Sequence, residues 1–277
     1  MSAPPGFFPC VLRVLCAGEF LLALAVTSCG APLMKLPAGP GAPATDAVDA
    51  FAQATSVCRG IRTLTAEVAA SGNVGGQRFR VRLSAGVDAP ASARLEAVAP
   101  FGAPFFIFVA TNDDATLFLP RDERVVEHGR PADVLDAVAG VPLSASDLHA
   151  VLTGCTPAVS QPEGRALGAD WRMITDAAGD AIYLRREAAA QPWQLAAIVH
   201  RAWRVDYRDQ LNGLPRTLRI TSAPRDGSAS FDLTLALTQV ETNIALDAEV
   251  FRVQVPRTAQ SITLDELRHA RPGVREN

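Results

Sequence analysis

Phe79-Arg80-Val81-Arg82-Leu83-Ser84-Ala85 alternates apolar and polar side chains at every second residue. Successive side chains of a β-strand point to opposite faces, so this stretch predicts a strand with one buried face and one solvated face. Gly75-Gly76 precedes it and predicts a hairpin turn from a strand at Thr63 to Gly72. The fold therefore starts from an antiparallel hairpin that carries arginines on its solvated side.

Alternating or continuous apolar runs recur along the rest of the chain. They predict further strands at 93–99, 105–111, 116–119, 124–127, 170–175, 181–186, 195–200, 203–208, 216–221, 230–238 and 250–255. Helical spacing predicts a helix of about 14 residues from Asp46, two helices between Pro131 and Gly154, and a short helix at Thr263 to Ala270. Residues 156–166 are expected to form a polar loop.

Grouped strands and grouped helices indicate the α+β class. We expect a strongly curved antiparallel sheet that forms an incomplete β-barrel, with helices covering its open apolar side.

The N-terminus carries the sequence pattern of a lipoprotein. A short apolar run at Phe20 to Val26 ends in Val26-Thr27-Ser28-Cys29, which resembles a bacterial lipoprotein cleavage site. We expect residues 1–28 to be a signal peptide, Cys29 to carry acyl chains such as palmitate, residues 29–45 to be a lipidated tether and residues 46–277 to be one domain. The alternatives are a buried N-terminal helix or a single membrane span.

Charge and cysteine content narrow the possible functions. The chain has 26 basic and 29 acidic residues, a balance that argues against binding nucleic acid through its phosphates. Cys58 and Cys155 remain after Cys29, and in an oxidising compartment they form either a disulfide or two separate buried thiols. No cysteine or histidine spacing suits a metal, so we expect no metal or cofactor.

No nucleophile, zinc-protease or nucleotide-binding motif occurs, and the four histidines lie far apart in sequence. We therefore expect no catalytic residue and no enzymatic activity.

Ala99-Pro100-Phe101-Gly102-Ala103-Pro104 interrupts two predicted strands. Proline and glycine predict a surface turn, where a large apolar residue such as Phe101 is unexpected. Phe101 either folds back onto the core or forms an apolar tip that enters a membrane or contacts another protein's lipid. Arg78, Arg80 and Arg82 are expected on a solvated strand face, with contact to anionic lipid head groups as the alternative.

Three segments resemble the lipoprotein-localisation family of LolA and LolB, and LolB in particular. They are VAPFGAPFFIF (98–108), VLDAVAGVPLSASDLHAVLTG (134–154), and Trp203-Arg204-Val205-Asp206-Tyr207 followed by Leu214-Pro215-Arg216. The resemblance implies an incomplete antiparallel barrel, closed by helices, with an apolar cavity that holds acyl chains. It also places Pro100, Phe101 and Gly102 in a loop that contacts membrane or cargo. The segment from Asn243 onward extends past the family's usual end, and either closes the barrel or lies over it.

The expected function is that of a lipid-anchored protein on the periplasmic face of the outer membrane. It would bind acyl chains or lipoproteins delivered by a periplasmic carrier protein and help insert them into that membrane. The alternative is a structural or assembly lipoprotein that binds protein partners. The candidate cavity residues come from dry strand faces and the helices: Val81, Leu83, Phe106, Phe108, Leu135, Val138, Leu148, Leu218 and Ile220.

Overall fold

The computed structural model describes residues 33–156, 162–176, 179–222 and 230–269. The chain divides into two compact units, residues 1–34 and 35–277, and the fold below is that of the second unit. The predicted signal peptide and Cys29 lie outside the described residues. Among the described helices, none has both the length and the apolar content that a bilayer crossing requires.

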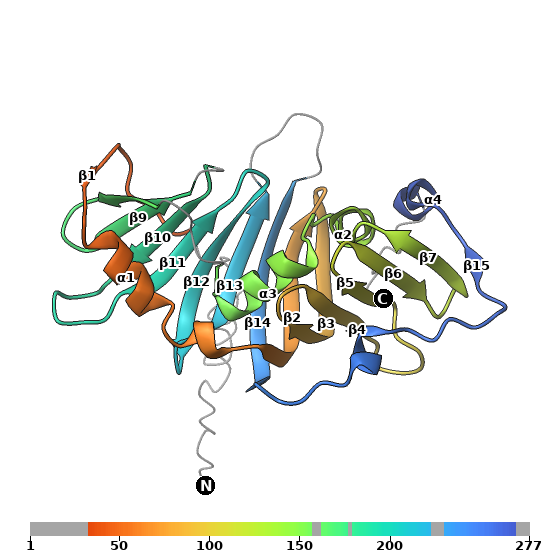
Figure 1. The fold of residues 1–277 in the computed structure, drawn as a ribbon. Coiled ribbons are helices and arrows are strands. Elements are labelled where there is room, and N and C mark those ends of the chain that lie inside the picture. The colour runs from red at the N-terminus through yellow and green to blue at the C-terminus, as the bar shows by residue number, and fades with distance from the viewer. Residues whose placement is uncertain (1–32, 157–161, 177–178, 223–229, 270–277) are drawn as a thin grey trace, which may run out of the picture. The chain divides into compact units, whose positions relative to one another are not determined.

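Over the described residues, one sheet of fifteen strands dominates the second unit (Figure 1). In chain order the strands are β1 (Ala42–Pro43), β2 (Thr63–Val74), β3 (Gln77–Asp88), β4 (Ser92–Val98), β5 (Ile107–Thr111), β6 (Asp114–Leu119), β7 (Arg124–Gly129), β8 (Glu163–Ala166), β9 (Trp171–Thr175), β10 (Ala181–Arg185), β11 (Gln194–Val199), β12 (Trp203–Leu211), β13 (Leu214–Ser222), β14 (Phe231–Thr242) and β15 (Gln260–Ser261).

The strand order is β1-β8-β9-β10-β11-β12-β13-β14-β2-β3-β4-β5-β6-β7-β15. Every pairing is antiparallel except that of β15 with β7, which is parallel. The two edge strands, β1 and β15, are two residues long each. Short edges offer few unpaired backbone groups to another chain. Of the predicted curved antiparallel sheet forming an incomplete β-barrel, a large, open and mainly antiparallel sheet is confirmed.

The hairpin from which the prediction started lies near the middle of this sheet. β2 and β3 pair along their whole length, from Thr63 with Asp88 to Val74 with Gln77. Val81 and Ala85 are buried, whereas Arg78, Arg80 and Arg82 are exposed. The alternation seen in the sequence therefore separates an inner, dry face of the sheet from an outer, wet one.

The helices are α1 (Ala47–Ala54), α2 (Pro131–Ala139), α3 (Ala145–Thr153) and α4 (Leu264–His269), with short 3-10 segments η1 (Cys58–Gly60) and η2 (Ala248–Phe251). Local sequence fixes the ends of α2 and α3. α2 begins at Pro131 and is capped by Gly140, and Gly140 and Gly154 both adopt the left-handed conformation that glycine favours. Ser144 and Asp147 form a capping box that starts α3.

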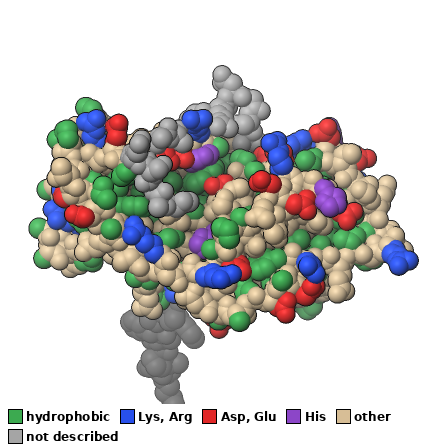
Figure 2. All heavy atoms as spheres, in the orientation of Figure 1, with side chains coloured by type: hydrophobic (Ala, Val, Ile, Leu, Met, Phe, Trp, Pro, Cys, Tyr) green, Lys and Arg blue, Asp and Glu red, His purple; other side chains and the backbone are tan. Residues whose placement is uncertain are grey.

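Figure 1 shows α1, α2 and α3 on the same side of the sheet. α1 packs against β8 to β11, α3 against β3, β4 and β13, and α2 against β6 and β7. Buried apolar side chains of these helices and of the inner strand faces belong to one cluster, which extends from Ala47 to Leu267. The whole cluster lies within residues 35–277, so this unit has its own hydrophobic core. From the helix side, charged groups of both signs are scattered among hydrophobic side chains (Figure 2).

The predicted helix from Asp46 is too long. α1 ends at Ala54, and the hydroxyl of Thr55 donates a hydrogen bond back to the carbonyl of Phe51 at 2.7 Å. Such local bonds by threonine compete with helix continuation. The Asp46 carboxylate does not cap α1; it accepts two hydrogen bonds from Arg172, at 2.8 and 2.7 Å.

Three other predictions were wrong in part. Residues 163–166 form strand β8 and not a loop, because Ala42–Pro43 and β9 pair on either side of it. The same pairing places the end of the predicted tether, at Ala42–Pro43, within the sheet. Residues 250–255 form no strand: η2 ends at Phe251, and backbone carbonyls there bond to a side chain instead of a neighbouring strand.

Of the two alternatives that the sequence left open for the segment after Asn243, the structure supports the one in which it lies over the sheet. It lies over the outer face of the sheet, where Arg94 of β4 donates to the carbonyls of Val250 and Arg252, each at 3.2 Å. It then adds β15 beside β7 and ends in α4, which packs on α2 through the fully buried Leu267.

Candidate functional site

The loop between β4 and β5 presents Phe101 to solvent. Phe101 is 90% exposed, whereas most large apolar side chains of the unit are buried. Backbone hydrogen bonds between Ala97 and Phe105, and between Ala97 and Phe106, both 2.9 Å, close the base of the loop. Of the two alternatives, folding back onto the core is therefore wrong. Pro100 and Gly102 are exposed on either side of the ring.

Arg121, in the turn between β6 and β7, holds this loop from the side. Its Nε donates to the carbonyl of Ala103 at 3.0 Å and its Nη2 to the carbonyl of Phe101 at 3.3 Å. Its guanidinium carbon lies 4.0 Å from the centre of the Phe105 ring. Gly102 has φ 78°, a conformation that a residue with a Cβ would adopt only with strain. The loop is thus braced so that the Phe101 ring points away from the protein.

Arg121 is a residue of this loop's support that the sequence alone did not indicate. Its only signal was its position in a Pro-Arg-Asp turn, which gives no information about a contact 20 residues away.

The nine candidate cavity residues all lie in or against the single hydrophobic cluster. Leu83 and Val138 are half-buried, and the others are buried: Val81, Phe106, Phe108, Leu135, Leu148, Leu218 and Ile220. The sheet and the helices thus bring these residues together in one apolar region. Their role in holding a ligand stays a prediction.

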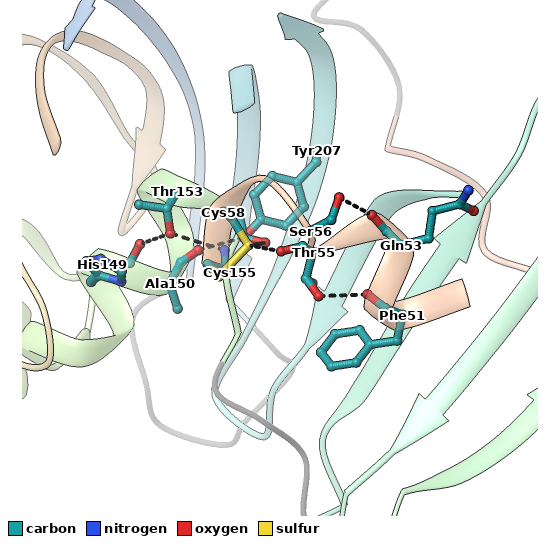
Figure 3. The surroundings of a disulfide bond; sticks show 11 residues. Phe51, Gln53, Thr55, Ser56, Cys58, His149, Ala150, Thr153, Cys155 and Tyr207 are labelled. Carbon is teal, nitrogen blue, oxygen red and sulfur yellow. Dashed lines mark hydrogen bonds between the residues drawn. A yellow bond between two sulfur atoms is a disulfide. The ribbon is translucent and has the colours of Figure 1, made fainter. Parts of the chain in front are cut away.

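A disulfide joins Cys58 in η1 to Cys155, the residue after Gly154 at the end of α3, with the two Cα atoms 5.3 Å apart (Figure 3). Thr153 supports this corner, since its hydroxyl accepts a bond from the Cys155 amide at 3.1 Å and donates to the His149 carbonyl at 2.7 Å. Tyr207 of β12 donates to the carbonyl of Ala150 at 3.4 Å. The segment after α1, the end of α3 and the sheet are therefore linked at one place.

Burial changes the titration of two side chains beside this corner. It lowers the pKa of His149 below its usual value, an effect that the backbone groups of Arg62 and Ile61 partly oppose. It raises the pKa of the Tyr207 phenol, so this hydroxyl stays protonated and acts as a hydrogen-bond donor.

A cavity of about 620 Å³ lies elsewhere, between the outer face of β4 to β6 and the segment after Asn243. Val109 and Phe251 contribute apolar surface to it, and Asp88, Asp114 and Arg252 contribute charge. None of the nine candidate residues lines this cavity. Within the described ranges, no three His, Cys, Asp or Glu side chains come together as a metal site would need.

Neither a family model nor a curated protein matches this chain. Solved structures align with it. A LolA superfamily protein from Nitrosomonas europaea has a TM-score of 0.48 and 10% identity, over 76% of this chain and 99% of that one. A DUF1329 family protein from Desulfovibrio piger has a TM-score of 0.44 and 11% identity, over 76% and 98%. The lipoprotein LppX of Mycobacterium tuberculosis has a TM-score of 0.31 and 11% identity, over 73% and 98%.

Proposed function

We propose that this protein is a lipoprotein of the bacterial cell envelope that binds acyl chains, of lipids or of other lipoproteins, and passes them to a membrane. The observation that carries the proposal is the exposure of Phe101, 90% of whose surface faces solvent at the tip of a braced loop. Burying such a ring is worth about 1.5–3 kcal/mol. A fold that holds it in water therefore forgoes that stabilisation, which a bilayer would restore.

The acyl chains would bind between the inner face of the sheet and the helices. Each methylene removed from water contributes about 0.8 kcal/mol, so a dry surface suffices and no covalent step is needed. Leu83 and Val138 are the half-buried members of the candidate set, and they mark where a chain would enter. Entry requires a helix to move away from the sheet, and α2, which carries Val138, contains neither of the disulfide cysteines.

The anchor in this proposal is Cys29, with acyl chains in the outer membrane and the domain on its periplasmic face. The stretch between Cys29 and β1 would then set how far the domain reaches. Cargo would arrive from a periplasmic carrier protein, and Phe101 would meet the membrane that receives it. No enzymatic activity is part of the proposal.

The test uses the unit from Lys35 to Asn277, which contains the whole hydrophobic cluster. We expect mass spectrometry of its organic extract to detect bound acyl lipid, and a fluorescent polyene fatty acid to bind with 1:1 stoichiometry. Val138→Glu should weaken that binding at least tenfold. Val48→Glu is the matched control, because Val48 also lies on a helix but is 46% exposed.

The acyl site would be refuted if the unit showed no saturable binding of the fatty acid. It would also be refuted if Val138→Glu and Val48→Glu weakened that binding equally. Stable cross-links to envelope proteins in the absence of bound lipid would then favour the structural or assembly role.

A further inference from the structure

We propose that the outer face of β3 docks on a bilayer surface rich in anionic phospholipid, through Arg78, Arg80 and Arg82. This deepens the proposed function and rests on it, because it specifies which membrane surface Phe101 meets. The three residues alternate with Phe79 and Val81, so their side chains share one face of one strand, and all three are exposed. Spaced by two residues, they span about 14 Å of strand.

Arg78, Arg80 and Arg82 form an arginine ladder whose positive charge is not neutralised by the acidic side chains that the structure describes. Among the described residues, no ion pair involves Arg78, Arg80 or Arg82. Two acidic residues lie on the neighbouring strands, Glu67 of β2 and Glu96 of β4. Both pair with Ser84 of β3, which lies two residues beyond Arg82.

Asp232 of β14 also lies on this side of the sheet, but its carboxylate accepts hydrogen bonds from Arg219, at 2.7 Å for Oδ1. An excess of positive charge therefore remains on β3.

The register places this charge beside the apolar loop. Arg82 pairs with Val98, the last residue of β4, and β3 continues past that point through Arg80 to Arg78. The Phe101 loop leaves β4 at the same end. Val98 is 47% exposed and Phe101 is 90% exposed. Exposed apolar groups next to unpaired arginines suit a membrane interface, where rings enter the acyl boundary and guanidinium groups contact phosphates.

Charge on the neighbouring turn does not alter this conclusion. Arg121 carries a positive charge at the base of the loop, and the exposed Asp122 and Glu123 follow it directly. That turn is thus not cationic overall, and the preference for anionic lipid rests on β3. A bilayer also suits the shape better than a small ligand does, because the ladder lies on the outer face of the sheet and not in a cavity.

The experiment measures binding of the Lys35–Asn277 unit to sedimented vesicles of phosphatidylcholine, with and without 30% phosphatidylglycerol. Each arginine near an anionic surface contributes a factor of about five, so Arg78→Gln, Arg80→Gln and Arg82→Gln together should lower binding to anionic vesicles roughly 100-fold. The matched control, Arg59→Gln, Arg62→Gln and Arg185→Gln, removes the same charge from exposed arginines elsewhere. It should change binding less than threefold.

Equal binding to both vesicle types would overturn the inference. An equal loss of binding in the two triple variants would overturn it as well. An acidic protein surface would then be the better partner for these arginines. High salt should abolish the difference between the vesicles, since 1 M salt shortens the screening length to about 3 Å. Fatty-acid binding by the same protein preparations is measured in a separate assay. Loss of that signal with the vesicle preference intact would refute the proposed acyl site and not the docking surface.

Discussion

Cys58 and Cys155 are 97 residues apart in sequence, and their disulfide ties the segment after α1 to the end of α3. The bond therefore links the ends of two helices that pack on different strands of the sheet, α1 on β8 to β11 and α3 on β3, β4 and β13. A link between the ends of these helices restricts how far either can move from the strands on which it packs.

We expect Cys155→Ser to destabilise the unit, because the chain-entropy model gives about 4–5 kcal/mol for a closed loop of this length. Urea unfolding monitored by circular dichroism measures the loss. The same variant should exchange bound fatty acid at the parent rate, because the proposed entry moves α2, which the disulfide does not hold. Cys58→Ser is the partner variant and should behave alike. Faster exchange in both would show that ligand entry requires α1 or α3 to move, and not α2.

Phe101→Glu should abolish transfer of a labelled acyl ligand to vesicles while leaving the free energy of unfolding within about 0.5 kcal/mol of the parent value. The side chain contacts solvent and not the core, so only the membrane step depends on it. Phe101→Leu keeps an apolar tip and should retain most transfer. If the glutamate variant transferred normally, the loop would have no part in membrane contact.

Arg121→Gln should loosen the loop, because it removes the donors to the Phe101 and Ala103 carbonyls. Hydrogen exchange of the amides at 99–104 is expected to become faster, with transfer reduced several-fold. Asp122→Asn changes the neighbouring exposed residue of the same turn and serves as the control. Equal exchange in both variants would mean that the turn does not brace the loop.

His149 should make the protein less stable in mild acid. Its folded-state pKa is lowered by burial, so the unfolded chain binds the proton more tightly than the folded one. Stability from this group is therefore full above pH about 6.5 and declines as pH falls through that value towards the folded pKa. His149→Gln should flatten the pH dependence of urea unfolding between about pH 7 and pH 5. His128→Gln, at a highly exposed position, is the control.

Leu267→Ala should cost about 2–5 kcal/mol of stability, because it opens a cavity where α4 packs on α2. Leu264→Ala, at a partly buried position on the same helix, should cost less. If neither variant shifted the unfolding midpoint, the segment after Asn243 would contribute nothing to the fold.

Local sequence patterns predicted many of the strands and helices. Alternation at Phe79 to Ala85 predicted β3 and its two faces, and helical spacing predicted two helices between Pro131 and Gly154, where α2 and α3 lie. Such features depend on neighbours within a few residues, so they can be predicted from a single sequence. The same reasoning failed at β8 and at 250–255, where pairing partners far away in sequence decide whether a short segment is a strand.

For the candidate site, the sequence by itself determined that Phe101 lies in a turn and that arginines share one strand face, because turn chemistry and the two-residue period are local properties. Only the tertiary structure decided that Phe101 points into solvent, since that depends on Arg121, 20 residues away. Register between β3 and β4, set by hydrogen bonds along both strands, placed the arginines beside that loop. Interactions between residues distant in sequence thus turned separate local features into one surface.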